Sequence, residues 1–228
     1  MITPQTRTML SFPAVDIGGI VRRACDILLA GTAGVLLSPL MLMIAIAIWA
    51  ETGRPIVYSH QRLGKGGWPF RMYKFRKFHT RADGNNCPLT MDGDPRLTAA
   101  GRVLVAWKFD ELPQLWNVLR GEMSIVGPRP ESLAFADCFR DGFEKILEHK
   151  PGLVGPSQIL FRQESRLYPT DIDPVEFYRR VLFPTKAKID LAYFPKRTFS
   201  SDLRWIVRTG LAISGRATSA EMRRVTTQ

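Results

Sequence analysis

The most prominent feature of the hydrophobic pattern is one long uncharged block near the start of the chain. Residues 27–50 contain no Asp, Glu, Lys or Arg and lie between Asp26 and Glu51. A run of about 18 or more apolar residues fits the thickness of a bilayer better than it fits a buried core helix. The block also starts too late and is too long for a cleaved signal peptide. The pattern therefore predicts a membrane segment.

Ser38 and Pro39 divide this block into two halves. Proline lacks a backbone donor and clashes with the preceding turn, so the helix should bend or break there. Each half is about 18 Å long, which is shorter than the hydrocarbon core of about 30 Å. Basic residues flank the block on both sides, and the positive-inside rule draws both ends to the cytoplasm. We expect a re-entrant helix, and a kinked single span with its N-terminus outside is the alternative.

After the block, the pattern changes to short segments typical of a β-hairpin. Residues 56–58 are rich in β-formers, residues 64–67 form a glycine-rich turn, and residues 70–75 alternate between apolar and basic side chains. The turn lacks the GxxxxGK[ST] spacing of a phosphate-binding loop. We therefore interpret it as the turn of the hairpin.

Helical spacing returns in the second half of the chain. A helix is predicted over residues 110–120, with Asp110 as its N-cap and Gly121 at its end, from the apolar stripe of Leu112, Leu115, Trp116 and Leu119. A second hydrophobic helix is predicted over residues 133–149. From Lys196 onward, basic and apolar residues interleave as in an amphipathic element at a membrane surface. A solvated helix face has the same pattern and is the alternative.

Composition and charge narrow the class of protein. The chain has 228 residues and a formal net charge of +11, and its mean hydropathy of -0.07 excludes a polytopic membrane protein. Such a charge indicates a polyanionic partner, namely a nucleic acid, an anionic lipid or a phosphorylated substrate. The uncharged block argues against the nucleic acid. Cys25, Cys87 and Cys138 form no CxxC motif, which argues against a zinc site or a disulfide framework.

Asp110 and Glu111 are the main candidates for chemistry. A carboxylate at a helix N-terminus stays ionised, and the free N–H groups there suit a phosphate. An ionised Asp can attack phosphorus to form an acyl phosphate, while an adjacent Glu binds Mg²⁺ or orients the nucleophile. A simple N-cap is the plainer interpretation of such a pair. The run Asp92-Gly93-Asp94 resembles a metal-binding motif but is more typical of a turn.

Several cations accompany this pair in the sequence. Lys74 and Arg76 share one face of the predicted strand. Arg96 and the segment 127–130 supply further guanidinium groups, whose geometry matches phosphate. Together with a membrane segment, these residues indicate an enzyme that handles a phosphate at the bilayer.

A long ordered set of motifs supports that interpretation. The most specific one is DELPQLWNVLRGEMSIVGPRPE, which runs from Asp110 to Glu131. The others are RACD at 23–26, LSPL at 37–40, QRLG at 61–64, FRMYKFR at 70–76, DPRLT at 94–98 and KPGL at 150–153, followed by Gly155, Gln158, Arg162, Asp190, Tyr193, Ser200 and Asp202. With these motifs, residues 20–210 of the chain resemble the bacterial sugar transferases, which are small monotopic polyprenyl-phosphate phosphoglycosyl transferases.

The resemblance implies a mostly helical α+β fold of the monotopic membrane class. It implies a re-entrant helix broken at Ser38-Pro39 and a small cytoplasmic catalytic domain with interfacial amphipathic helices. We predict a lead-in at 1–20, the re-entrant helix at 21–51, the catalytic domain at 52–212 and a basic tail at 213–228. With about 20 residues before the block, we do not expect the four additional N-terminal spans of longer relatives.

The resemblance also implies an activity and a location. The protein would transfer a phosphosugar from a UDP-sugar to a polyprenyl phosphate and release UMP, as the first step of exopolysaccharide or related glycan assembly. It would do so at the cytoplasmic face of the inner membrane. The sequence does not specify the sugar, the length of the polyprenol or the oligomeric state.

Each role is carried over to a residue of this chain. Asp110 would be the nucleophile that carries the phosphosugar, and Glu111 would be its metal-binding or supporting carboxylate, with Mg²⁺ required and both carboxylates as candidate ligands. The substrates would be bound by Lys74, Arg76, Arg96, Pro128, Arg129, Pro130, Gln158 and Arg162.

Four positions depart from the family's pattern. Val105 stands where the family has an Arg five residues before the nucleophile, and Lys77 replaces a Thr in its KFRTM motif. His60 replaces the Gln of its QxR motif, and Val154 replaces the Thr that follows KPG-x. These departures fit a divergent substrate. They equally fit a catalytically weakened relative that acts as a membrane-bound interaction partner in a polysaccharide assembly system.

Overall fold

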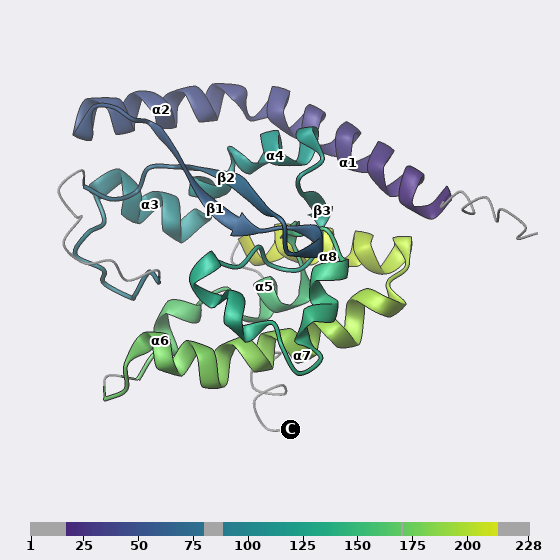
Figure 1. The fold of residues 1–228 in the computed structure, drawn as a ribbon. Helices are drawn as coiled ribbons and strands as arrows, with labels where there is room; N and C mark the ends of the chain where they lie inside the picture. Colours follow the sequence, from purple (N-terminus) through teal and green to yellow (C-terminus); the bar gives the residue numbers. More distant parts are fainter. Residues whose placement is uncertain (1–16, 80–88, 170, 214–228) are drawn as a thin grey trace, which may run out of the picture.

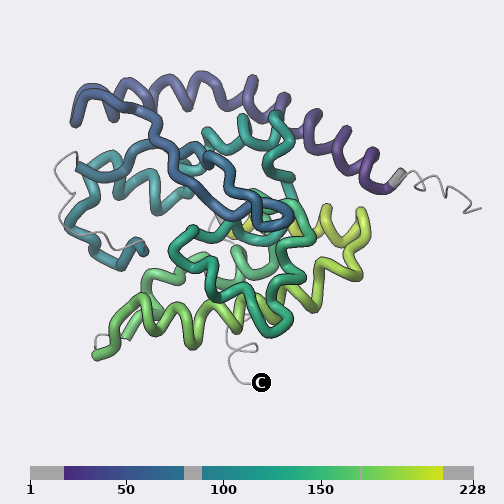
Figure 2. The backbone as a smooth tube through the Cα atoms, viewed as in Figure 1, coloured from purple at the N-terminus to yellow at the C-terminus, as the bar shows by residue number. Residues whose placement is uncertain are grey.

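A computed structural model describes residues 17–79, 89–169 and 171–213. The described chain is mostly helical, with a two-stranded antiparallel sheet and a two-stranded parallel sheet (Figure 1). The expected mostly helical α+β class is confirmed. Figure 2 shows the path of the chain, with a long bent rod of residues 17–52 along one side and residues 174–193 on the opposite side.

The bent rod consists of α1 (Ile17–Leu36) and α2 (Ser38–Thr52), which meet at an angle of 59°. Pro39 lies in the first turn of α2, and the Ser38 hydroxyl donates to the carbonyl of Val35 at 2.7 Å. The predicted bend at Ser38-Pro39 is therefore confirmed. Among the described residues, no single helix is long and apolar enough to cross a bilayer, whereas the bent pair has the length and composition to do so when both helices are counted.

The two faces of the bent pair differ. On the inner face, Ala30 packs with Val118, while Ile44 and Ile48 pack with Phe75. On the outer face, large apolar side chains are exposed; they include Ile27, Leu28, Val35, Leu36, Leu42, Met43, Ile46 and Trp49. An exposed apolar surface of this extent is typical of a region that contacts a membrane or another protein. The helices begin and end near the predicted bounds of 21 and 51, and residues 1–16 lie outside the described part.

The predicted β-hairpin is confirmed. β1 (Val57–Leu63) and β2 (Pro69–Phe75) pair antiparallel, and Lys65–Gly67 turn between them as η1. Gly66 and Gly67 have φ of 71° and 77°, which favours glycine at both positions. Tyr58 pairs with Lys74 in the register. The alternation of strand side chains places these two residues on the inner face.

The stretch that carries the candidate carboxylates differs from its prediction. α3 (Ala99–Trp107) ends at Lys108, which has a left-handed φ of 61°. Asp110 then lies in a 3₁₀ turn, η2 (Phe109–Glu111), and α4 (Gln114–Arg120) begins only after Pro113. The prediction of one α-helix from Asp110 was wrong because the first turn is 3₁₀: the amide of Leu112 donates to the carbonyl of Phe109 at 3.2 Å, and that of Leu115 to the carbonyl of Leu112 at 3.1 Å. Gly121, with φ of 81°, ends α4 as predicted.

The predicted apolar stripe of Leu112, Leu115, Trp116 and Leu119 is also not the most buried face of this helix. Trp116 is 56% exposed, whereas Asn117 and Val118 are fully buried. Asn117 is buried because its amide joins three elements: it accepts from the backbone N–H of Tyr73 and donates to the carbonyl of Arg71 and to Glu122. A polar residue thus occupies the core side of α4, which the spacing of leucines did not predict.

After α4 the chain forms a two-stranded parallel sheet and two 3₁₀ segments. β3 (Ser124–Val126) pairs parallel with β4 (Gly152–Val154). Between them lie two 3₁₀ segments, η3 (Leu133–Cys138) and η4 (Phe143–Glu148), where one helix over 133–149 was predicted. That prediction was wrong because Asp141 and Gly142 adopt positive φ of 56° and 97°, which interrupts a helix.

The C-terminal third is helical. It comprises α5 (Pro156–Leu160), η5 (Glu164–Arg166), α6 (Pro174–Phe177), a π-helical turn η6 (Tyr178–Leu182), α7 (Phe183–Tyr193), η7 (Phe194–Lys196) and α8 (Phe199–Ile213). α8 confirms the helix in the predicted amphipathic element, and its exposed apolar side chains recur every four residues as Phe199, Leu203, Val207 and Leu211. Residues 214–228, which include most of the predicted tail, lie outside the described part.

Candidate active site

The two candidate carboxylates lie side by side in a cluster of lysine side chains. We call this cluster, made of Lys74, Lys77 and Lys108, the nest. Asp110 is buried, with 3% of its surface exposed, and Glu111 is partly buried. The Lys74 ammonium donates to Glu111 Oε1 at 2.8 Å, and the Lys77 ammonium lies 3.9 Å from Asp110 Oδ2. Each carboxylate therefore has its own lysine partner.

The local sequence explains why these groups meet. Lys74 is on the inner face of β2, and Lys77 follows two residues after the strand ends. Lys108 directly precedes the carboxylate turn, and its left-handed backbone turns the chain from α3 into η2. Because the hairpin packs on this turn, cations that are far apart in the sequence surround the same pair of carboxylates.

Electrostatics couple the members of this nest. Burial alone would raise the pKa of Glu111, but the charges of Lys74, Lys108 and Arg129 outweigh it and hold that pKa below its usual range. Burial lowers the pKa of Lys77 to about 8, although the carboxylate of Asp110 opposes this change. Burial also lowers the pKa of Lys108. The site therefore combines an ionised Glu111 with an excess of positive charge.

Arg129 faces this nest from the segment that follows β3. Its guanidinium forms no hydrogen bond or ion pair with any residue that the structure describes, and Glu111 is the main charge that raises its pKa against the effect of burial. Tight backbone packing sets its position, since the amide of Gly152 donates to the carbonyl of Pro128 at 2.9 Å. A side chain on Gly152 would place its Cβ 2.1 Å from the nitrogen of Gly127. An unpaired guanidinium on a rigid segment is suited to bind an anion.

A buried network of charged side chains interacts with Arg129, and it was not predicted from the sequence. The ammonium of Lys186, on α7, lies 3.5 Å from Glu131 and 3.0 Å from Glu164, and it donates to the hydroxyl of Tyr178 at 3.0 Å. Glu131 and Glu164 both contribute to the raised pKa of Arg129. Glu131 closes the longest motif, so its position was the available signal. Lys186 and Glu164 carried no such signal.

His60 is a second feature that lies at the nest. It stacks on Tyr58, with ring centroids 5.6 Å apart, and accepts a hydrogen bond from Arg62. Burial, together with the nearby charges of Arg62, Lys74 and Lys77, lowers the pKa of His60 to about 3. His60 is therefore neutral near pH 7. Tyr58, His60 and Arg62 alternate along β1, which extends beyond the predicted β-rich residues 56–58.

Four of the predicted substrate-binding residues are engaged elsewhere. Arg76 donates to Thr52 and to the carbonyl of Gly53, which closes the C-terminal end of α2. Arg96 pairs with Asp94, with 2.6 Å between Nη2 and Oδ2. Gln158 donates to the carbonyl of Gly152, and Arg162 donates to the carbonyls of Ala106 and Ala212. The sequence could not predict the partners of Arg76 and Arg162, because these acceptors lie on segments that are distant in the chain.

The four departures from the family pattern have different outcomes. Lys77 and His60 lie at the nest, as described above. Val154 contributes its backbone carbonyl, which accepts from the amide of Gly127 at 2.9 Å, so this bond does not depend on its side chain. Val105 lies in the last turn of α3, and its carbonyl accepts from the amide of Lys108. Asp92 and Asp94 take part in ion pairs with Arg166 and Arg96, as expected of a turn.

One of the candidate carboxylates has a buried oxygen without a partner. Within the described residues, Asp110 Oδ1 has no hydrogen-bond partner; the other buried polar atoms of this kind belong to Arg22, Arg76, Gln114 and Gln158. An unsatisfied buried polar atom costs free energy, so such atoms point to a bound group or to a strained site. No group of three or more His, Cys, Asp or Glu that could hold a metal is found in the described part of the chain.

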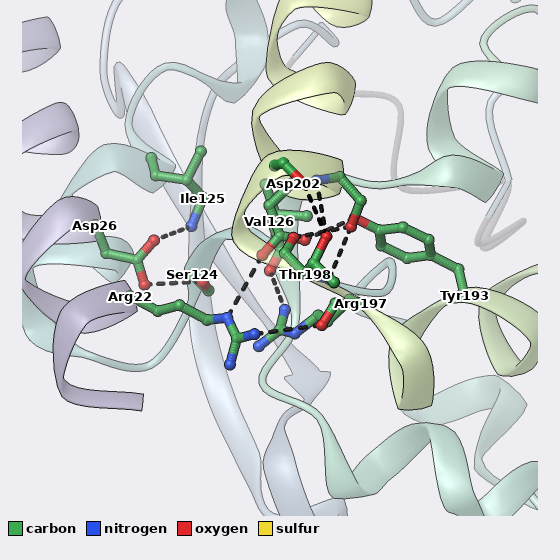
Figure 3. A network of polar contacts seen from close by, with 11 residues as sticks. Arg22, Asp26, Ser124, Ile125, Val126, Tyr193, Arg197, Thr198 and Asp202 are labelled. Carbon is green, nitrogen blue, oxygen red and sulfur yellow. Dashed lines mark hydrogen bonds and ion pairs between the residues drawn. The ribbon is translucent and has the colours of Figure 1, made fainter. Parts of the chain in front are cut away.

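The bent helix pair is fixed directly to the segments of the site. Asp26 of α1 accepts from the Ser124 hydroxyl and from the amide of Ile125, both at 2.8 Å (Figure 3). Arg22 pairs with Asp202 at 3.6 Å, and Tyr193 also donates to Asp202. Arg23 donates to the carbonyls at the end of α4. These contacts join α1 to β3, which leads into the Arg129 segment.

An apolar groove of about 440 Å³ is lined by residues that directly follow Glu111 in the chain. The bent pair lines it as well, as do Val57 and Tyr73 of the hairpin. The lining includes Gly34, Ser38, Met41, Leu112, Leu115 and Trp116. The leucines of the predicted stripe therefore face an open apolar groove and pack only partly against the core.

Comparisons with known proteins agree on one family. The model of the family described as bacterial sugar transferase matches residues 17–216. A UDP-glucose:undecaprenyl-phosphate glucose-1-phosphate transferase of Caulobacter vibrioides is 35% identical over 191 residues, which are 82% of this chain and 67% of the relative. The exopolysaccharide production protein ExoY of Sinorhizobium fredii is 36% identical over 74% of this chain and 77% of its own length.

A third relative is longer. A UDP-N-acetylgalactosamine-undecaprenyl-phosphate N-acetylgalactosaminephosphotransferase of Aeromonas hydrophila is 41% identical over 143 residues, which are 61% of this chain and 34% of the relative. The names of the Caulobacter and Aeromonas relatives differ in the sugar but share undecaprenyl phosphate.

Proposed function

This chain belongs to the bacterial sugar transferase family, and from that premise we propose that it transfers a phosphosugar from a UDP-sugar to a polyprenyl phosphate and releases UMP. We further propose that this transfer begins the assembly of an exopolysaccharide or related glycan. The observation that carries the proposal is Asp110. Its carboxylate is buried among cations, and its Oδ1 has no partner within the described residues.

In the first half of the reaction, Asp110 acts as the nucleophile. A carboxylate oxygen forms a bond to the β-phosphorus of the UDP-sugar, and the bond from that phosphorus to the bridging oxygen breaks. The electron pair of the broken bond leaves with UMP. Lys74, Lys108 and Arg129 supply fixed positive charge for the phosphoryl oxygens, which is the main means by which such sites lower a barrier.

In the second half, an oxygen of the polyprenyl phosphate attacks the same phosphorus. The bond from phosphorus to Asp110 breaks, and its electron pair returns to the carboxylate. The apolar groove described above suits the first units of the lipid, because apolar surface on both partners leaves water together. The phosphate of the lipid would then lie at the cations of the nest.

Mg²⁺ is the cofactor that we propose, and of the two candidate carboxylates Glu111 would hold it. The described contacts of Glu111 engage only its Oε1, through Lys74, and leave Oε2 for the ion. Mg²⁺ commonly binds through one or two carboxylates together with substrate phosphates. When bound, it would neutralise charge on the diphosphate. Because the nest and Arg129 already supply positive charge, we expect the ion to bind together with the nucleotide.

The bent helix pair and α8 are proposed as the membrane-bound part. Exposed apolar side chains on both, and the acceptor's lipid nature, support this assignment. We propose that the pair enters the cytoplasmic leaflet of the inner membrane and returns to the same side. The anchors from α1 to β3 would then hold the catalytic groups at the height of the lipid phosphates.

The proposal is tested with purified full-length protein, Mg²⁺, polyprenyl phosphate and a panel of UDP-sugars. Wild-type protein should release UMP with at least one sugar, and Asp110→Asn should abolish both UMP release and the covalent phosphosugar adduct. Asp137→Asn, at an exposed residue away from the nest, is the matched control and should retain activity. Absence of UMP release with every sugar would refute the proposal and favour the weakened relative that acts as an interaction partner.

A further inference from the structure

The two oxygens of the Asp110 carboxylate lie in different surroundings. Oδ2 lies 3.9 Å from the ammonium of Lys77. Oδ1 is buried and has no hydrogen-bond partner in the part of the chain that the structure describes. One oxygen is thus held by a charge, while the other keeps its lone pairs free.

Lys77 is arranged to serve Asp110. Its side chain is nearly buried, at 11% exposure, and its ammonium also donates to the Thr90 hydroxyl at 3.0 Å. The neighbouring carboxylate of Glu111 is already bound by Lys74 at 2.8 Å. Among the described ion pairs, Asp110 is therefore the only carboxylate that pairs with Lys77.

We propose that Lys77 is a further catalytic residue, which holds Oδ2 of Asp110 and leaves Oδ1 as the attacking atom. The inference rests on the proposed function, since it assigns atoms within that reaction. Oδ1 forms the bond to phosphorus, and the electron pair of the broken bond leaves with UMP. Oδ2 then becomes the carbonyl oxygen of the acyl phosphate and remains next to the Lys77 ammonium.

Lys77 has its larger effect in the second half of the reaction. There the bond from phosphorus to Oδ1 breaks, and the carboxylate is the leaving group. Its returning negative charge is shared with Oδ2, where the ammonium stabilises it. Without this cation Asp110 is a stronger nucleophile but a poorer leaving group. The covalent phosphosugar adduct should therefore form and then persist.

The experiment compares Lys77→Met, Lys77→Arg and Thr90→Val in the full chain. Each variant is given the UDP-sugar that the wild type accepts, with Mg²⁺ and polyprenyl phosphate. Three quantities are measured: the initial burst of UMP, the steady-state rate of transfer to the lipid, and the fraction of protein that carries the phosphosugar by intact mass. Lys188→Met, an exposed lysine on α7, is the matched control.

For Lys77→Met we expect a loss of steady-state transfer of about tenfold or more, consistent with the removal of one charged group from a transition state. The UMP burst should remain and the labelled fraction should rise above that of the wild type. Lys77→Arg should restore most of the transfer. Thr90→Val keeps the ammonium and removes one hydrogen bond that it donates, so its transfer should fall less than that of Lys77→Met.

Several results would overturn the inference. Transfer by Lys77→Met within twofold of the wild type would do so, as would equal losses of burst and transfer with no rise in labelled protein. If Lys77→Met does not fold, Lys77→Arg decides: loss of transfer without labelled protein would count against the assignment. A wild type that releases no UMP from any sugar would instead refute the proposed function, so the two failures are distinguishable.

Discussion

Replacement of Asp26 by alanine should separate the bent helix pair from the catalytic segments. Asp26 lies on α1 and is buried, and its carboxylate accepts from the Ser124 hydroxyl and the Ile125 amide at 2.8 Å each (Figure 3). Alanine removes both acceptors and leaves two donors buried. These donors belong to β3, which leads directly to Gly127 and Arg129.

The expected magnitude follows from these two bonds. A hydrogen bond to a charged group contributes about 1.5–3 kcal/mol, so two of them give about 3–6 kcal/mol. For a chain of this size, each kcal/mol shifts the melting temperature by about 2–4 °C, so a fall of at least about 6 °C is expected. Asp26→Asn keeps one good acceptor and should lose about half as much. Sugar-phosphate transfer should fall with the stability, because Arg129 loses its support.

The assay is thermal unfolding of the full chain in detergent, followed by UMP release below the transition. Asp92→Ala is the matched control. Its carboxylate is 66% exposed and pairs with Arg166 at 3.7 Å, and such surface pairs contribute about 0–1 kcal/mol. A melting temperature of Asp26→Ala that equals that of the control would refute the reasoning, since the two bonds would then contribute nothing.

Two further predictions concern topology and pH. For the topology, Gly18→Cys and Ser59→Cys are introduced into a variant whose three cysteines are replaced by serine. Both should react with an impermeant thiol reagent only after the cytoplasmic side of the membrane is opened. Labelling of the two positions from opposite sides would instead indicate a single span. Burial raises the pKa of Asp190 from 3.8 to about 7, although its hydrogen bonds with Ser157 oppose this change. Between pH 4 and 7, Asp190 is therefore ionised in the unfolded chain but still protonated in the folded chain. The free energy of unfolding should therefore fall by up to about 4 kcal/mol as pH rises through this window. In melting curves recorded over this pH range, Asp190→Asn should abolish the fall. A wild-type stability that rises from pH 5 to 7 would contradict this assignment.

Features that depend on neighbouring residues were predictable. Pro39 determined the bend of the long helix, because the missing N–H acts within one turn of its own position. The alternation around the glycine-rich turn predicted the hairpin, and Gly121 predicted the end of α4. Asp110 and Glu111 were found from the longest motif. In each case the signal and its effect lie within a few residues of one another.

Features that depend on which partner is in reach were not predictable. Lys77 and Arg76 are adjacent cations in the sequence, yet Lys77 pairs with Asp110 whereas Arg76 binds the end of α2. The apolar stripe that begins at Leu112 matched a buried helix face, but α1 packs on α4 through Val118, and the stripe faces an open groove. Lys186 gave no signal, because its role comes from Glu131 and Glu164 on other segments.

The sequence by itself determined the broken apolar helix, the hairpin, the carboxylate pair and the family, since each is encoded in a continuous run of residues. The tertiary structure decided which of the many cations meet the carboxylates, which oxygen of Asp110 is left without a partner, and how α1 is fixed to β3. The physical reason is that a long basic side chain has many possible acceptors within the reach of its flexible stem. Only packing at close range selects the one that lowers the free energy, and packing joins residues as far apart as Asp26 and Ser124.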